Sequence, residues 1–269
     1  MNLQPTAEIK DGIRFPFGEN WLRFLPALTD DMLAEAAHSL QQMLRVNSLQ
    51  GVSFLDAGSG SGLFSLAARR LGATVHSLDN DPQSVACASE LKRRYFPGDV
   101  GWTIEKGSVL DGSYLAGLGK FDVVYSWGVL HHTGDMYKAF SNIVTTVTSG
   151  GKLFISVYND QGWRSKYWSF IKRTYGRNRV CRLAIISTHA PYLFGLRYLV
   201  RALSGRSAPG RGMSLWRDTV DWLGGYPFEV AKPEDVFCFF RDHGLVLENL
   251  RTCGGRMGCN EFLFRRERA

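Results

Sequence analysis

Residues 54–70 read FLDAGSGSGLFSLAARR and combine an apolar run, a glycine-rich loop and a segment with helical spacing. The glycines at 58, 60 and 62 permit tight backbone dihedrals and a close approach to a ligand. Apolar residues after the loop recur as on one face of a helix, and Gly72 ends that pattern. A helix N-terminus that follows such a loop favours a polar or anionic group. The stretch therefore predicts a strand, a ligand-binding loop and a helix.

Apolar runs and helical patterns alternate up to about residue 157, which indicates βα units of a parallel sheet. Pro82 stands at the first position of the second predicted helix, where its missing N–H costs nothing. The predicted strands lie at 52–58, 74–79, 102–106, 121–126, 152–158 and in the segments LVLENLRT and NEFLFRR. The last two flank the turn CGGRMGC and indicate an antiparallel hairpin. We expect an α/β fold with a doubly wound, mostly parallel sheet of seven strands.

Two regions stand outside this alternation. The N-terminal region contains a helix pattern, TDDMLAEAAHSLQQML, which Thr29 or Asp30 would cap. The segment after the fifth strand is too long for a plain loop and predicts a helical insertion. We expect an N-terminal extension or lid over 1–50, a core domain over 51–158 and 233–269, and a substrate lid over 159–232.

Positive charge is concentrated in the predicted insertion. The formal net charge of the chain is +7. Between residues 159 and 217 there are twelve Lys or Arg and a single acidic residue, Asp160, whereas the rest of the chain has a small acidic excess. Because a basic segment attracts anions, we expect this segment to contact the substrate.

Composition indicates one large folded domain with an insertion, since the 269 residues are 45% hydrophobic. The N-terminus lacks the basic and apolar pattern of an export signal. No uncharged apolar run reaches the ~18 residues of a spanning helix. We therefore expect a cytoplasmic protein. The five cysteines form no C-x-x-C pair, so neither disulfides nor structural zinc are expected.

Two carboxylates accompany the glycine loop. Asp56 precedes the loop, and Asp79 ends the second predicted strand. A carboxylate at that place can accept hydrogen bonds from both hydroxyls of a ribose. A dinucleotide oxidoreductase is the rival interpretation, but its G-x-G-x-x-G pattern needs a third glycine that residues 63–65 do not supply. The pattern favours a nucleoside ligand other than a dinucleotide.

Four motifs in order resemble those of the class I S-adenosylmethionine-dependent methyltransferases, in the ubiquinone and menaquinone methylase-like branch. LDAGSGSG is similar to their first motif, HSLDND to the ribose-binding turn, KGSVLD to the next motif and FDVVYSWGVLHH to the fourth. The resemblance implies a Rossmann-like fold, S-adenosylmethionine as cofactor and S-adenosylhomocysteine as product. The cofactor-binding residues that it implies are Asp56, Gly58, Ser59, Gly60, Ser61, Gly62, Asp79, Asn80, Ser108, Val109, Ser126 and Trp127.

The fourth motif ends in a histidine pair, which provides the catalytic candidates His131 and His132. A hydroxyl acceptor must lose its proton during methyl transfer, and imidazole suits this task near neutral pH. Adjacent residues of a helical turn point about 100° apart. We therefore expect one histidine to face the pocket and the other to pack, and we favour His131 as the base.

Two alternatives concern the chemistry. A metal-dependent O-methyltransferase would combine one histidine with Asp135 and a distant carboxylate, but no complete ligand set is recognised, so no metal is expected. Amino and base methyltransferases use an Asn/Asp-Pro-Pro-aromatic motif, which is replaced here by Ser126-Trp127-Gly128. This difference favours methylation of oxygen or carbon over nitrogen.

The insertion follows the fifth strand, at the edge where open α/β sheets bind ligands. We expect a small anionic acceptor, such as a sugar acid, a nucleotide sugar or a phosphorylated metabolite, held by arginines between aromatic walls. The substrate-binding candidates are Trp163, Arg164, Lys166, Tyr167, Arg173, Arg197, Trp216 and Arg217.

Other acceptor classes stay open. PYLFGLRYLVRAL has the composition to lie at an anionic membrane surface, which fits a quinone or polyprenyl-lipid acceptor. RNA is the next alternative, although no recognisable RNA-binding module is present and nucleic acid is not the expected partner. The chain could also bind S-adenosylmethionine without catalysis, or carry the basic segment as a solvated lid. Its oligomeric state is left open.

Overall fold

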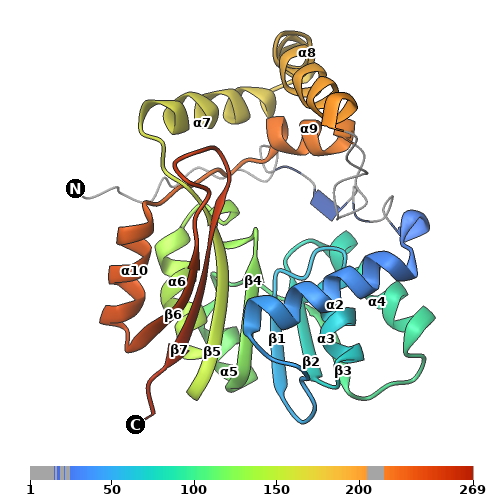
Figure 1. Cartoon of the computed structure of the whole chain (residues 1–269), viewed down its shortest axis with the longest axis vertical. Coiled ribbons are helices and arrows are strands. Elements are labelled where there is room, and N and C mark those ends of the chain that lie inside the picture. The colour runs from blue at the N-terminus through green and yellow to red at the C-terminus, as the bar shows by residue number, and fades with distance from the viewer. Residues whose placement is uncertain (1–14, 16, 19–20, 22–24, 205–214, 269) are drawn as a thin grey trace.

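The computed structural model describes residues 15, 17–18, 21, 25–204 and 215–268, with the backbone alone at 194, 196–204, 215–218 and 221. Within them one sheet has the strand order β3-β2-β1-β4-β5-β7-β6 (Figure 1). The strands are β1 (Ser53–Ala57), β2 (Thr74–Asp79), β3 (Trp102–Lys106), β4 (Phe121–Trp127), β5 (Val147–Tyr158), β6 (Leu245–Arg251) and β7 (Cys259–Arg266). The strands β1 to β5 pair in parallel, whereas β7 is antiparallel to both β5 and β6. The predicted fold class is confirmed.

Strand β5 begins earlier than its apolar run predicts. It starts at Val147, which pairs with Phe121, and the register then shifts so that Lys152 pairs with Val123. The intervening residues include Gly150, whose φ is 77°. Because this polar, glycine-containing start carries no alternation of apolar residues, the hydrophobic pattern could not reveal it.

Helices cover both faces of the sheet. They are α2 (Asp30–Leu44), α3 (Leu63–Arg70), α4 (Pro82–Tyr95), α5 (Gly112–Leu118), α6 (Met136–Thr145), α7 (Trp163–Tyr175), α8 (Arg179–Ser204), α9 (Leu215–Gly224) and α10 (Pro233–Asp242), with 3-10 turns η1 (Leu25–Ala27) and η2 (Leu130–His132). Thr29 caps α2, as one of the two predicted candidates, because its hydroxyl accepts a hydrogen bond from the Met32 amide. The capped helix then buries one apolar face against α3 and the sheet.

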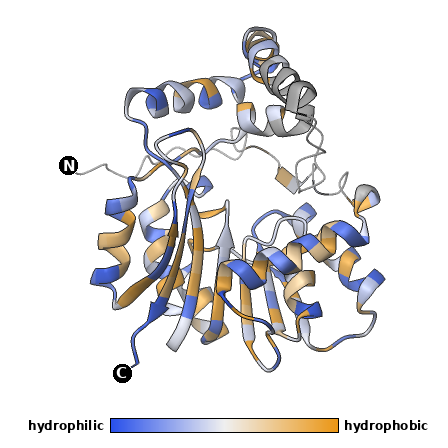
Figure 2. Cartoon of the chain, viewed as in Figure 1, coloured by the Kyte–Doolittle hydropathy of each residue, from blue (hydrophilic) through white to orange (hydrophobic). Residues whose placement is uncertain are grey.

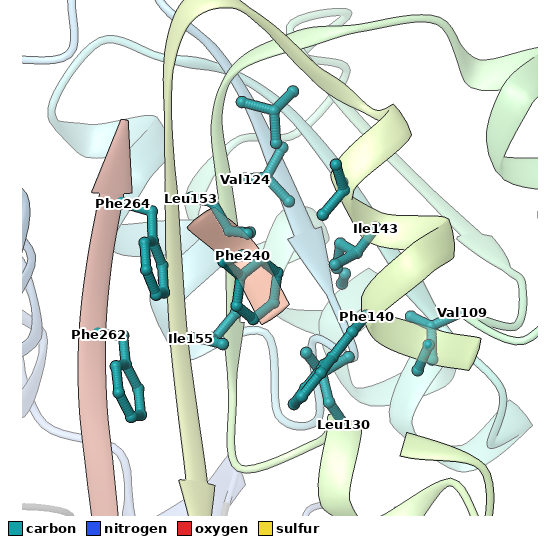
Figure 3. Packing of buried hydrophobic residues seen from close by; sticks show 14 of the residues in the cluster. Val109, Val124, Leu130, Phe140, Ile143, Leu153, Ile155, Phe240, Phe262 and Phe264 are labelled. Carbon is teal, nitrogen blue, oxygen red and sulfur yellow. The ribbon is translucent and has the colours of Figure 1, made fainter. Parts of the chain in front are cut away.

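Alternate residues of the central strands point to opposite faces, as a period of two requires. Val124 and Ile155 belong to a buried cluster that also contains residues of α5, α6 and α10. Val123 and Phe154 belong to the cluster formed with α2, α3 and α4. Figure 3 shows part of the first cluster, in which Phe240 of α10 is fully buried. Figure 2 shows hydrophobic residues concentrated along the strands, so the sheet is the centre of both cores.

The predicted insertion is helical and has a small core of its own. Helices α7, α8 and α9 pack around Ile171, Tyr175, Ile185 and Leu223, and Phe15 of the N-terminal segment joins them. They lie beyond the carboxyl ends of the parallel strands (Figure 1). None of the helices in the described part of the chain has the length and apolarity needed to cross a bilayer.

A buried lysine ties the insertion together. The ammonium of Lys172 in α7 donates to the Trp222 carbonyl of α9 and lies 4.2 Å from the Trp222 ring centroid. It also lies 4.9 Å from the ring centroid of Phe228, in the segment that returns to the core. Since burying an uncompensated ammonium is costly, these carbonyl and ring contacts favour one packing of α7 against α9.

Substitution of Gly62 tests how the glycine loop packs in the fold. Gly62 has a φ of 79°, and a Cβ there would lie 2.8 Å from the Ala88 Cα of α4. Gly62→Ala should lower the free energy of unfolding by at least about 2 kcal/mol, because it adds left-handed strain and overpacking. Urea titration measures this. Gly117→Ala is the matched control, since a Cβ at Gly117 in α5 meets no atom within 4 Å and stability should stay equal or rise. Equal stability of both variants would contradict the assignment.

Candidate functional site

A cavity of about 590 Å³ lies at the carboxyl edge of the parallel strands. Its wall includes the loops that follow β1, β2 and β3, the turn after β4, the end of β5 and the start of β7. The N-terminal segment and the insertion complete it with Phe17, Trp21, Leu193 and Trp222. Parallel strands bring their carboxyl ends to one edge, so residues far apart in sequence meet there.

The glycine loop after β1 forms one end of the cavity. Gly58, Gly60 and Gly62 have φ values of 88°, 53° and 79°, which favour glycine. A Cβ on Gly58 would lie 2.4 Å from the Val129 side chain, and one on Gly60 would lie 3.1 Å from the Trp21 indole nitrogen. The loop backbone therefore lies directly against its neighbours. Among the described atoms, the buried hydroxyl of Ser59 has no hydrogen-bond partner, which leaves a polar group available to a ligand.

Asp79 joins the glycine loop to the next turn. One of its carboxylate oxygens accepts from the Gly60 amide at 2.9 Å, and the other accepts from the Asp81 amide at 2.8 Å. Asp79 and Asn80 both line the cavity, which is where a ribose and its base would be expected.

Asp56 is buried at the end of β1 and stands at the end of a chain of hydrogen-bond donors. The Trp102 indole donates to Ser77 at 2.8 Å, Ser77 donates to Ser65 at 2.7 Å, and Ser65 donates to Asp56 at 2.5 Å. Burial raises the pKa of the Asp56 carboxyl to about 7, and the bond from Ser65 opposes that rise. With its pKa near 7, the Asp56 carboxyl ionises close to neutral pH.

The histidine pair is arranged opposite to our expectation. His132 lines the cavity, whereas His131 is buried behind it with its ring centroid 4.0 Å from that of Tyr158. Within the described structure neither ring nitrogen of His131 has a hydrogen-bond partner. Burial, followed by the proximity of His132, lowers the pKa of His131 well below its ordinary value. The expectation that His131 faces the pocket is wrong, because η2 turns the first histidine into the core.

The segment that returns from the insertion holds this turn in place. The Pro227 carbonyl lies 2.6 Å from Nδ1 of His132, and because a carbonyl can only accept, Nδ1 donates this hydrogen bond. The Glu229 amide donates to the His131 carbonyl at 2.9 Å. The Glu229 carboxylate accepts from the amides of Gly134 and Met136 at 2.8 and 3.0 Å. Neither Pro227 nor Glu229 is among the site residues predicted from the sequence.

Most of the cofactor-binding candidates line the cavity. They are Asp56, Gly58, Ser59, Gly60, Ser61, Asp79, Asn80, Ser108, Val109 and Trp127. Gly62 does not, since it packs against α4, and Ser126 does not, since its buried hydroxyl donates to the Ala57 carbonyl at 2.7 Å. Trp127 is held by a 3.0 Å hydrogen bond to Glu261 at the start of β7. The strand period explains why Ser126 does not line the cavity, because Ser126 and Trp127 point to opposite sides of β4.

The substrate-binding candidates are placed differently from our expectation. Arg164, Lys166 and Arg173 are exposed and do not line the cavity, and neither do Trp163 and Tyr167. Trp168 is half-buried in the core of the insertion. The side chains of Arg197, Trp216 and Arg217 lie outside the described part of the chain. Neither Lys nor Arg occurs among the described residues of the cavity wall.

The cavity wall around His132 consists of aromatic rings where cations had been expected. The ring centroids of Phe17 and Tyr158 lie 5.0 and 5.5 Å from that of His132. Trp222 lies 5.6 Å from Tyr158, and Phe15 lies 4.9 Å from Phe17. The N-terminal stretch RFPFGENWLRFL supplies Phe15, Phe17 and Trp21 to the cavity, and its aromatic composition is the sequence signal that could have indicated this part of the wall.

The remaining candidate groups have structural positions. Asp135 caps α6, where its carboxylate accepts from the Lys138 amide at 3.3 Å. In the described part of the chain, no three His, Cys, Asp or Glu side chains gather as a metal-ligand set. All five cysteines are thiols, and Cys259 lines the cavity.

Known proteins share both the sequence and the fold of this region. A family model described as a methyltransferase domain matches residues 55–155. Over 112 residues the chain is 30% identical to a ubiquinone biosynthesis O-methyltransferase of Methylobacterium nodulans, covering 41% of this chain and 43% of that protein. Over 59 residues it is 46% identical to a ribosomal protein L11 methyltransferase of Methylococcus capsulatus, covering 22% of this chain and 20% of that protein. The chain thus spans less than half of the length of these two relatives.

A solved structure extends the likeness to nearly the whole chain. Magnesium protoporphyrin IX methyltransferase from Synechocystis PCC 6803, with bound SAM, has a TM-score of 0.57 at 14% identity and covers 97% of this chain and 100% of that one. At this identity the likeness concerns the fold. The residues that the family model matches coincide with β1 to β5, which supply the glycine loop, Asp79 and the histidine turn, and the chain therefore carries a class I S-adenosylmethionine-dependent methyltransferase domain.

Proposed function

We propose that this protein binds S-adenosylmethionine and transfers its methyl group to a hydroxyl oxygen of an apolar, ring-bearing small molecule. The observation that carries this proposal is the composition of the cavity wall. One end is a polar loop with two carboxylates, and the other is a set of aromatic rings around His132.

The polar end fits the cofactor. The unpartnered hydroxyl of Ser59 and the amides of the glycine loop offer polar contacts to the methionine part, and Asp56 offers a carboxylate to its ammonium. Asp79 is suited to the ribose hydroxyls, while Asn80, Ser108 and Val109 are suited to the adenine. When bound, S-adenosylmethionine supplies an electrophilic methyl group on a sulfonium.

The aromatic end fits the acceptor. Rings of Phe17, Tyr158 and Trp222 exclude water and can stack on a flat apolar molecule. Holding an acceptor hydroxyl in line with the methyl group accounts for much of the rate that such a site provides. Nε2 of His132 can accept the hydroxyl proton, because Nδ1 is committed to the Pro227 carbonyl.

The small anionic acceptor that the basic insertion suggested is the weaker candidate. Its recognition would require cations in the wall, and the described wall offers the carboxylates of Asp56, Asp79, Asp81 and Glu261 instead. An unpaired acceptor carboxylate or phosphate beside them would be repelled. A ubiquinone-like phenol, by contrast, brings a neutral ring and a hydroxyl. The non-enzymatic alternative is a protein that binds the cofactor without turnover. Assays of methyl transfer to a panel of phenolic acceptors distinguish this alternative from catalysis.

The cofactor assignment is tested by calorimetry with S-adenosylmethionine and S-adenosylhomocysteine. Asp79→Asn should weaken both by about tenfold or more, because it removes the charge that accepts the ribose hydroxyls. Glu35→Gln, on the exposed side of α2, is the control and should bind like the unaltered protein. Failure of the unaltered protein to bind either nucleoside would refute the assignment.

The pH dependence of binding tests Asp56. Affinity for S-adenosylhomocysteine should rise with pH through about 7, since ionised Asp56 attracts the ammonium of the ligand. Ser65→Ala removes a donor that lowers the pKa of Asp56, so the midpoint should move up by about one pH unit or more. Binding titrations between about pH 6 and 9 measure this midpoint. Ser141→Ala, exposed on α6, should leave the midpoint unchanged. An unchanged midpoint in Ser65→Ala would contradict the role of the donor chain.

Paired histidine variants test the base. His132→Ala should lower kcat by ~10²-fold or more while cofactor affinity stays within a few-fold. His131→Leu keeps a buried apolar side chain of similar size and should retain most of the activity. Release of S-adenosylhomocysteine with a phenolic acceptor is the readout. Loss of activity in His131→Leu together with full activity in His132→Ala would overturn the assignment.

A further inference from the structure

Helix α7 exposes a stripe of large aromatic side chains. Trp163, Tyr167 and Phe170 are 73%, 43% and 62% exposed. Their spacing of four and three residues places them within an arc of about 60° on one side of the helix. Large rings gathered on one helical face and open to solvent mark a contact surface more often than scattered apolar residues do.

The opposite side of α7 already has its packing partners. Ile171 and Tyr175 belong to the core of the insertion, and Lys172 is buried against Trp222 and Phe228. The helix therefore carries two apolar faces, and the buried one supplies the core of the insertion. In the exposed face, Tyr167 also contacts the fold through a 2.7 Å hydrogen bond between its hydroxyl and Nε2 of His189 in α8, whereas the rings of Trp163 and Phe170 are mostly exposed.

Cations border the exposed stripe. Arg164, Lys166 and Arg173 of α7 are exposed, and Lys166 and Arg173 lie within about 80° of the stripe. The corner between α7 and α8 adds exposed cations and aliphatic side chains, namely Arg177, Arg179, Arg182, Val180 (77% exposed) and Leu183 (65% exposed). No Asp or Glu occurs between residues 161 and 217. The partner of this surface must therefore be anionic and able to take up apolar side chains.

We propose that this face of α7, together with the α7–α8 corner, docks on the surface of an anionic phospholipid bilayer. Tryptophan and tyrosine favour the boundary between headgroups and acyl chains, while Lys and Arg pair with anionic headgroups. Val180 and Leu183 favour a bilayer over RNA, because nucleotides stack on rings but offer no acyl phase for aliphatic side chains. Since no described helix can span a bilayer, the contact is peripheral.

Docking would also affect the supply of acceptor, a consequence that rests on the proposed function. Helix α8 belongs to both regions, because Val180 and Leu183 near its start are part of the docking surface and Leu193 lines the cavity. An apolar acceptor dissolved in the bilayer could then enter without crossing water. Of the segment PYLFGLRYLVRAL, Leu193 is buried against the cavity and Tyr192 is 68% exposed, while the side chains at 194 and 196–203 lie outside the described part of the chain.

Co-sedimentation with vesicles tests the docking without an activity assay. The full chain should bind vesicles of phosphatidylcholine with phosphatidylglycerol and bind pure phosphatidylcholine vesicles at least about tenfold more weakly. The double variant Trp163→Ser, Phe170→Ser, which leaves the Tyr167–His189 hydrogen bond in place, should lose about tenfold or more of the binding to the anionic vesicles. The triple variant Arg164→Gln, Lys166→Gln, Arg173→Gln should lose a similar factor.

The control removes exposed apolar side chains elsewhere. Val100→Ser, Val246→Ser and Leu250→Ser lie on the methyltransferase domain, where Val100 is 96% exposed, and together they should leave vesicle binding unchanged. Circular dichroism and S-adenosylhomocysteine binding establish that each variant is folded. The proposal is overturned if the unaltered chain does not bind anionic vesicles, or if the aromatic variant binds them as well as the control. It is also overturned if single-stranded RNA, and not vesicles, distinguishes the aromatic variant from the control. Failure of docking leaves cofactor binding unaffected, so it is distinguishable from failure of the proposed function.

Discussion

The carboxylate of Asp79 is the contact on which the cavity depends. It accepts from the amides of Gly60 and Asp81, and so joins the loop after β1 to the turn after β2. Asp81 in turn caps α4 and accepts from the Gly18 amide of the N-terminal segment at 2.9 Å. Because Asp79 joins two of these segments and also lines the cavity, it couples the shape of the site to the pairing of β1 with β2. The glycine loop can adopt left-handed dihedrals because these contacts stabilise it.

Charge at the bottom of the cavity is controlled by a balance between burial and hydrogen bonding. Burial alone would keep Asp56 protonated, whereas the donor chain from Trp102 through Ser77 and Ser65 favours its ionised form. The donors come from β3, β2 and α3, so two neighbouring strands and one helix contribute to the ionisation of one carboxyl group on β1. A buried network of this kind is rigid because every member has a partner of defined direction.

The insertion contributes to the site from a distance in sequence. Its return segment places the Pro227 carbonyl at His132 and the Glu229 carboxylate at the amides that follow the histidine turn. Its helices supply Leu193 and Trp222 to the wall, while α7 presents a separate aromatic face to the outside. Of the basic residues that suggested an anionic acceptor, Arg164, Lys166 and Arg173 are exposed on α7 and do not line the cavity. Their number indicated an anionic partner, but only the packing of α7 revealed in which direction they point.

Local patterns in the sequence determined the strands, the glycine loop, the cap at Thr29 and the carboxylates at the strand ends, because each depends on neighbours within one or two turns. Strand register decided the early start of β5, and the strand period decided the exclusion of Ser126 from the cavity. The turn η2 decided that His131 points into the core. Pro227, Glu229 and the aromatic wall were decided by tertiary structure alone. Pro227 and Glu229 act on residues 95 positions away, and Phe17 packs on His132 from the other end of the chain. No periodic pattern of side chains records which distant carbonyl, carboxylate or ring will pack against a given turn.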